Sequence, residues 1–260
     1  MEMLKTFDTY LNAPFADSLE KDFEAARVTL AGGDLAGITL QGALETMATR
    51  KDVAAFPRKA GLFLSALFQA LRRDETLDLM ALEDVLLDGI GAFGKGFDLS
   101  VKGCVGAYAG VCMAAGVFTV DGDAGDYCGM GMVGGKIVVK GLCENHAGHS
   151  MVGGEILIHK NAHDFLGNSM SGGKITVRAN AGYSVGYRMV GGVIEIQDLT
   201  WDWAGEEMVG GRIHMGGRIG REMGLSMAGG ELGLLEAHKD TPRIKPVGGK
   251  VVVFAKGAKR

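Results

Sequence analysis

Seven methionines recur with a 19-residue period that has no exception: Met113, Met132, Met151, Met170, Met189, Met208 and Met227. A glycine lies three positions before each of them, and six of the seven are followed by a Gly-Gly pair two and three positions later. A fixed period of about 20 residues is typical of a solenoid, in which each repeat buries its apolar face only by stacking on its neighbours. The spacing therefore limits the chain to a stacked architecture.

Each Gly-Gly pair precedes two apolar residues that are separated by one position, such as Ile156 and Ile158 or Ile175 and Val177. This alternation predicts a strand with alternate side chains pointing inward. One repeat at about 3.3 Å per residue can close a coil, and strands of successive coils pair about 4.8 Å apart. We therefore predict a mainly β solenoid, a β-helix of seven to eight 19-residue turns over residues 91–260, with methionines inside and glycines at the corners.

Residues 1–90 lie outside the repeat and have a mixed pattern. Their periodicity predicts helices over residues 17–26, 61–73 and 76–88 and a strand pair around 28–40, with a break at Pro57. Because a solenoid exposes a sheet edge at each end, we expect this mixed α/β segment to cap the stack. In an alternative interpretation, the amphipathic stretch from Leu62 to Leu71 docks into a partner protein.

Composition excludes several classes of function. With 47% hydrophobic residues, a net charge of −4 and no basic run, the chain is expected to be soluble and to bind no nucleic acid. We expect no signal peptide, and the most apolar stretch, residues 62–71, is too short to span a bilayer. The four cysteines show no C-x-x-C spacing, so we expect no disulfide framework and a cytoplasmic protein.

No pattern in the sequence predicts a catalytic, cofactor-binding or metal site. Residues 129–134 spell G-x-G-x-x-G, but the repeat explains these glycines and the required strand and helix are missing. Imidazole and carboxylate groups can bind zinc or iron where they converge, and four histidines lie close in the sequence near Glu144 and Asp164. They occupy four different slots of the repeat, which argues against convergence: His146, His149, His159 and His163.

Three outward features are more informative. An aromatic column occupies the slot two positions before the repeat glycine: Tyr108, Tyr127, His146, Phe165, Ser184, Trp203 and Glu222. We interpret this aromatic column as corner packing, with a ligand-stacking strip as the alternative. The outward strand slot is apolar at Val138 and Leu157, and exposed apolar patches mark docking surfaces. Large aromatics concentrate at interfaces, so Val138, Leu157, Trp201 and Trp203 are the candidate partner contacts.

The unit G-x-x-M-x-G-G-x-I-x-V, as in Gly148 to Ile158 and Gly167 to Val177, resembles the glycine-rich β-helical subunit of formylmethanofuran dehydrogenases. It resembles more loosely the C-terminal glycine-rich domain of the large chain of glutamate synthase. The resemblance covers residues 91–253 and implies a right-handed β-helix. The chain departs from it in residues 1–90 and at Trp201-Asp202-Trp203, where we expect either a local bulge or an anchor for a partner.

The resemblance implies a non-catalytic structural subunit of a hetero-oligomer. Its partners would be an amidohydrolase-like subunit, a formyltransferase subunit and a further subunit, which together move a formyl group between tetrahydromethanopterin and a methanofuran-type coenzyme and release formate. The metal ions and the coenzyme would reside in those partners. One alternative is a linker in a glutamate-synthase-like amidotransferase complex, and a weaker one is an independent enzyme that uses the histidine cluster.

Overall fold

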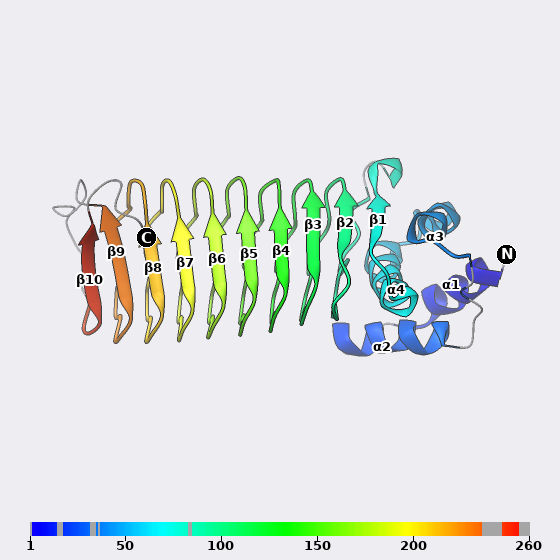
Figure 1. The fold of residues 1–260 in the computed structure, drawn as a ribbon, viewed down its shortest axis with the longest axis horizontal. Helices are drawn as coiled ribbons and strands as arrows, with labels where there is room; N and C mark the ends of the chain where they lie inside the picture. The colour runs from blue at the N-terminus through cyan, green and yellow to red at the C-terminus, as the bar shows by residue number, and fades with distance from the viewer. Residues whose placement is uncertain are drawn as a thin grey trace.

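The computed structural model describes residues 2–14, 18–31, 35, 37–82, 85–235 and 246–254. Ten strands form one parallel sheet in which spatial order follows chain order (Figure 1). Their bounds are β1 Glu75–Asp78, β2 Leu99–Lys102, β3 Val117–Asp121, β4 Lys136–Val139, β5 Glu155–Ile158, β6 Lys174–Val177, β7 Val193–Ile196, β8 Arg212–Met215, β9 Glu231–Leu235 and β10 Lys250–Phe254. The expected β-helix is thus confirmed as a parallel solenoid of about eight turns.

The pairing register confirms the period of the repeat. From β2 to β9, each strand residue pairs with its counterpart in the next repeat, as Ile137 pairs with Ile156 and Ile156 with Ile175. The first strand differs, because Glu75 in β1 pairs with Leu99, and β1 therefore extends the sheet to residues before the repeat. The predicted final strand is also confirmed, since Lys250 in β10 pairs with Glu231.

Contacts between successive turns explain why methionine and glycine recur together. A Cβ atom on Gly154, which has φ +84°, would lie 2.7 Å from the Cε atom of Met132 in the preceding turn. A Cβ atom on Gly167 would lie 2.5 Å from the Cδ1 atom of Ile194, which belongs to β7 in the next turn. All seven repeat methionines are buried, as predicted. The size of the residue at these glycine positions is therefore limited by contacts with neighbouring turns as well as by the conformation of their own turn.

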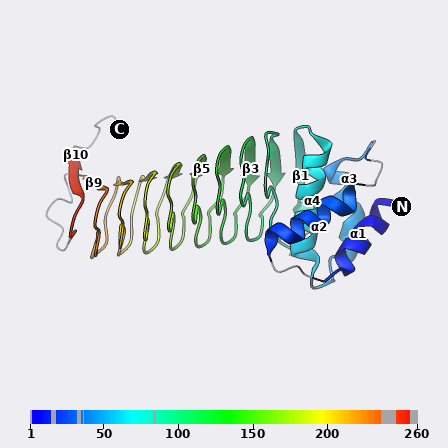
Figure 2. The ribbon, with the colours of Figure 1, turned by 90° about the horizontal axis from the view of Figure 1, so that it is seen from below.

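In the described part of the chain, four α-helices and two short 3₁₀ helices lie at the β1 end of the solenoid (Figures 1 and 2). Their bounds are α1 Glu2–Asn12, α2 Leu19–Leu30, α3 Leu40–Met47, η1 Ala48–Arg50, α4 Phe56–Leu71 and η2 Met80–Leu82. We call the helices α1 to α4 with η1 the helical cap. Its longest helix, α4, touches the first coil directly, because the Ser65 hydroxyl accepts a hydrogen bond from the Gly91 N–H at 2.9 Å.

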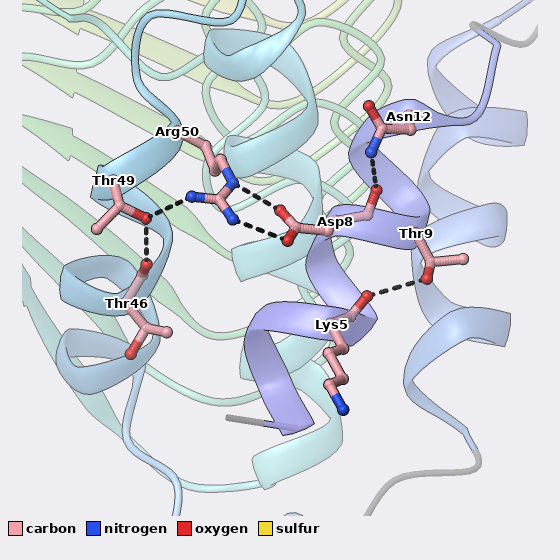
Figure 3. A network of polar contacts seen from close by, with 7 residues as sticks. All are labelled: Lys5, Asp8, Thr9, Asn12, Thr46, Thr49 and Arg50. Carbon is pink, nitrogen blue, oxygen red and sulfur yellow. Dashed lines mark hydrogen bonds and ion pairs between the residues drawn. The ribbon is translucent and has the colours of Figure 1, made fainter.

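Polar contacts fix the helices of the cap to one another. The Arg50 guanidinium donates to both carboxylate oxygens of Asp8 at 2.9 and 3.0 Å, which joins η1 to α1 (Figure 3). Lys59 of α4 is buried, and its ammonium group donates to the carbonyl oxygen of Tyr10 at 2.9 Å and to that of Ala13. These contacts join segments that are far apart in the sequence.

The sequence predictions for residues 1–90 are partly wrong. The helices expected at 17–26 and 61–73 are confirmed as α2 and α4, but Pro57 lies in the first turn of α4 instead of marking a break. The helix expected over 76–88 is wrong where described, since this stretch contains the last three residues of β1 and all of η2; residues 83 and 84 lie outside the described residues. The strand pair around 28–40 is also wrong where described, because α2 extends to Leu30 and α3 begins at Leu40; residues 32–34 and 36 lie outside the described residues.

The described helices of residues 1–90 lie at the β1 end of the solenoid, and their role as a cap that protects the sheet edge stays a prediction (Figure 1). Leu62, Phe63, Leu67 and Phe68 of α4 are buried within the chain itself. This apolar helix face is therefore not available to a partner, and the alternative docking interpretation of residues 62–71 is wrong. Within the described ranges, no helix is long and apolar enough to cross a bilayer.

Candidate partner-binding surfaces

The sheet face brings two of the predicted contact residues together. Val138 and Leu157 are paired neighbours on β4 and β5, and both side chains are half-buried. Leu157 borders a shallow depression of about 180 Å³ whose rim includes Lys136 and Glu155. These two charged groups form an ion pair at 3.2 Å. The face is therefore a small apolar area with a neutralised rim.

The structure places Trp201 and Trp203 together beside Tyr183. The Tyr183 ring lies 5.4 Å from that of Trp201 and 5.7 Å from that of Trp203, and we call these three residues the tryptophan patch. Trp201 is 46% exposed and Trp203 37%. The bulge considered at residues 201–203 is absent from this described turn, because Thr200 keeps its parallel bridges to Ala181 and Ile219. The patch thus lies on a regular turn and presents large aromatic surfaces to solvent.

The aromatic column is confirmed as corner packing in its first four members. The ring centroids of Tyr108 and Tyr127 lie 5.2 Å apart, those of Tyr127 and His146 4.7 Å apart, and those of His146 and Phe165 4.9 Å apart. The three pairs are stacked, with interplanar angles of 8°, 4° and 9°. All seven column residues have positive φ, between 54° and 66°. This conformation turns the backbone N–H toward the next coil, as Tyr127 N donates to the Asn145 carbonyl oxygen at 2.9 Å.

The four clustered histidines separate into different environments. His149 packs edge-on against His146 at 6.0 Å, whereas His163 Nδ1 lies 2.6 Å from the Glu144 carboxylate. Burial lowers the pKa of His149, and the nearby His146 lowers it further. Among the described residues, no three His, Cys, Asp or Glu side chains converge as metal ligands do. The arrangement of these described residues therefore gives no support to a histidine-based metal centre.

A third surface was missed by the sequence predictions. The residue that follows each repeat methionine is exposed in every turn, and we call this column, with its counterpart in the last turn, the valine ridge: Ala114, Val133, Val152, Ser171, Val190, Val209, Ala228 and Val247. The valines are 54% to 86% exposed. The signal was present in the sequence as a third column with the period of the repeat, but only the structure shows that its side chains point outward.

A ladder of side-chain acceptors also escaped the sequence analysis. The Asp126 Oδ1 atom accepts from the Asn145 N–H at 2.9 Å, Asn145 Oδ1 accepts from the Asp164 N–H at 3.2 Å, and Asp164 Oδ1 accepts from the Tyr183 N–H at 2.9 Å. Each side chain thus satisfies a backbone donor in the next turn, where the sheet pairing does not reach. Aspartate and asparagine in the same slot of successive repeats were the available signal.

Together, the fold and the surface columns define a glycine-rich parallel solenoid that carries apolar and aromatic side chains on its surface. The family model for the GXGXG motif matches residues 91–247, which is more than half of the chain. The chain therefore belongs to the GXGXG motif family. No curated protein matches it.

Proposed function

We propose that the chain is a non-catalytic structural subunit of a cytoplasmic formyltransferase/hydrolase complex related to formylmethanofuran dehydrogenase. In this role it supports formyl transfer between tetrahydromethanopterin and a methanofuran-type coenzyme, with release of formate. The amidohydrolase-like and formyltransferase partners, with a further subunit, would carry the metal ions and the coenzyme.

The observation that carries this proposal is the methionine–glycine contact between adjacent turns. From Met132 onward, each repeat methionine contacts the second glycine of the Gly-Gly pair in the next turn. The Cε atom of Met151, for example, lies 2.6 Å from the position that a Cβ atom on Gly173 would take. This contact is the physical basis of the G-x-x-M-x-G-G unit on which the resemblance to the formylmethanofuran dehydrogenase subunit rests. Membership of the GXGXG motif family supports the same assignment at a coarser level.

The surface chemistry supports a scaffold. Apolar and aromatic side chains reach the surface in three separate places on the solenoid: they are half-buried on the sheet face, and exposed in the tryptophan patch and along the valine ridge. Isolated exposed apolar residues need no explanation, but patches of them mark sites of protein–protein contact. A rigid solenoid with such patches is suited to hold several subunits at fixed distances from one another.

Co-purification tests the function. The native chain is isolated from its host under mild conditions, and the associated proteins are identified by mass spectrometry. We expect amidohydrolase and formyltransferase subunits, and a pterin-binding subunit would assign the complex to the dehydrogenase type. Glutaminase or FMN-domain partners would overturn the proposal in favour of an amidotransferase linker, and a lone chain with stoichiometric metal would overturn it in favour of an independent enzyme.

Substitutions then assign the proposed contact residues. Leu157→Asp and Trp201→Asp each place a carboxylate at a proposed contact, and we expect each to reduce the recovery of at least one partner about tenfold or more. Arg178→Asp, an exposed change just after β6, serves as the control and should leave recovery unchanged. Equal recovery for all three variants would exclude the sheet face and the tryptophan patch as contacts.

A further inference from the structure

The valine ridge is apolar for a reason other than backbone conformation. Valine favours extended backbone because it is β-branched, but threonine has the same shape and a similar preference. Threonine occurs at none of the eight ridge positions, and neither does a charged residue. Five valines that are more than half exposed therefore indicate that an apolar surface itself is maintained along the column.

The columns beside the ridge are also suited to close contact. On one side, the residues before the methionines are small and uncharged over four turns: Cys112, Gly131, Ser150 and Ser169. On the other side, the Gly-Gly pairs leave an open groove, which near β7 to β10 has a volume of about 730 Å³. The opposite side of this groove carries charged side chains that pair with one another, as Arg212 and Glu231 do in an ion pair at 2.9 Å. The first of these columns continues with Arg188 and Glu207, which are charged but form an ion pair at 2.7 Å. The ridge is therefore flanked by small uncharged residues up to Ser169 and by paired charges beyond it.

The helical cap already shows what packs against these columns. Helix α2 lies at the foot of the first strands and runs roughly along the long axis of the solenoid (Figure 1). The ring of Phe23 lies 4.7 Å from that of Phe93, and Val28 lines one cavity with Lys95. Phe93 and Lys95 stand one repeat before Cys112 and Ala114, so α2 occupies the first positions of the same two columns.

Beyond α2 the columns continue without a cover among the described residues. The reach of α2 ends near Cys112, whose thiol has a pKa raised by burial and by the charge of Glu20. Ala114 and all later ridge positions are exposed. The valine ridge is thus continuous with an intramolecular helix interface and differs from it only in that no described helix of this chain lies on it.

We propose that the valine ridge is the docking track for an amphipathic α-helix of a partner subunit, which continues the path of α2 along the solenoid. The ridge repeats about every 4.8 Å and a helix about every 5.4 Å, so apolar side chains at i, i+3 and i+7 match successive turns over a short track. From Ala114 to Val209 the track is about 24 Å long, which a helix of roughly 16 residues covers. This inference rests on the scaffold function proposed above and names the partner segment.

Site-specific photo-crosslinking in the isolated complex tests the geometry. A photoreactive side chain is placed in turn at Val133, Val152 and Ser171, with Arg178, an exposed residue outside the track, as the control site. We expect crosslinks from successive ridge positions to residues three or four apart in one partner segment. Residues one or two apart would indicate an extended strand, and crosslinks to this same chain would indicate a second copy. Either result, or crosslinks to lipid or to nothing, overturns the proposal.

A matched pair of variants tests the energetics. The double variant Val152→Asp, Val190→Asp changes only exposed positions and should retain the melting temperature of the unaltered chain. We expect it to lose the crosslinked partner at least tenfold in co-purification, while Val53→Asp, an exposed valine of the cap, retains it. If the unaltered chain has no formyltransferase-type partners, the proposed function fails. If it has them and the double variant keeps all of them, only the helix track fails.

Discussion

In the solenoid, nearly every buried side chain has a counterpart one repeat away, whereas the helical cap buries residues that have none. Ile156 pairs with Ile137 on one side and Ile175 on the other, and Met151 contacts Gly173 as Met132 contacts Gly154. In the cap, Lys59 reaches the carbonyl oxygen of Tyr10 from a distant part of the sequence. The first region is built from one contact repeated, and the second from single contacts that occur once.

This difference teaches where each region is vulnerable. In a stack, stability is approximately a sum of equal interactions between adjacent turns, so a defect in one turn weakens two interfaces and leaves distant turns intact. In the cap, one removed contact has no neighbour that replaces it. Substitutions in the two regions should therefore differ in size and in how far their effect spreads.

The largest effect is expected from Gly172→Ala in the middle of the stack. A Cβ atom at this position would overlap the carbonyl oxygen of Val152 in the preceding turn, and backbone cannot move aside as a side chain can. We expect a loss of about 3 to 4 kcal/mol in the free energy of unfolding. Denaturant unfolding measures the loss, and hydrogen exchange should show it in the turns around Gly172 with the cap still protected.

The neighbouring residue gives the control for this prediction. Ser171→Ala changes an exposed side chain next to Gly172 and should shift the free energy of unfolding by less than about 0.5 kcal/mol. An equally small loss for Gly172→Ala would mean that the turns can separate without cost at this corner. The tight stacking on which the comparison rests would then be refuted.

A smaller effect is expected from Lys59→Met in the cap. The change removes an ammonium group that donates to two backbone carbonyl oxygens, those of Tyr10 and Ala13, of which the Tyr10 contact is buried and the Ala13 contact partly buried. Burial disfavours the charged form of Lys59 and lowers its pKa. The variant no longer buries this charge, which offsets part of the loss. We expect a loss of about 2 kcal/mol in the free energy of unfolding, measured by denaturant titration.

Hydrogen exchange separates this variant from the glycine variant. For Lys59→Met the increase in exchange should be confined to α1 and α4, and the strands from β4 onward should keep their protection. The exposed Lys5→Met in α1 serves as the control and should change little. Faster exchange throughout the stack in Lys59→Met would show that cap and solenoid unfold as one unit.

The same difference decides how much of the fold could be predicted from the sequence. The repeat made the strands, the buried methionines and the parallel register predictable, because each signal occurs many times at one spacing. The cap offered no repetition. The apolar pattern of residues 76–88 indicated a helix, but the pairing of Glu75 with Leu99 turned its first part into β1. Such pairing is a tertiary effect that overrides local preference.

The candidate surfaces were only partly predictable for a related reason. Val138, Leu157, Trp201 and Trp203 could be proposed because an apolar or aromatic residue is unusual in their slots. The valine ridge was missed because a valine next to a buried methionine resembles a core residue. Near a corner of the coil, alternation alone does not distinguish outward from inward positions. The acceptor ladder of Asp126, Asn145 and Asp164 was missed because polar corner residues ordinarily indicate turns.

A third prediction concerns this ladder and a still smaller energy. Asp126→Ala removes the oxygen that accepts from the Asn145 N–H at 2.9 Å and should lower the free energy of unfolding by about 1 kcal/mol. Asp126→Asn keeps the acceptor, as Asn145 does toward Asp164, and should lower it by less than half as much. If both variants lose the same amount in denaturant unfolding, the carboxylate charge and not the hydrogen bond is responsible.

The smallest effect is a pH dependence that the histidine pair gives to the solenoid. Burial, and secondarily His146, lowers the pKa of His149 in the folded state below its ordinary value. As the pH falls, the unfolded chain therefore binds a proton at this histidine before the folded chain does. The stability that is present at pH 7 is lost as the pH falls through the ordinary histidine pKa of about 6.5 toward the lower pKa of the folded state. Because His149 is partly exposed, we expect a loss of less than about 1 kcal/mol in the free energy of unfolding between about pH 7 and pH 5, measured by denaturant unfolding.

The variant His149→Asn introduces the residue that occupies the same position one turn later, Asn168, and should flatten this part of the pH profile. An unchanged slope in the variant would assign the acid sensitivity to other groups, and the cap would then be the region to test.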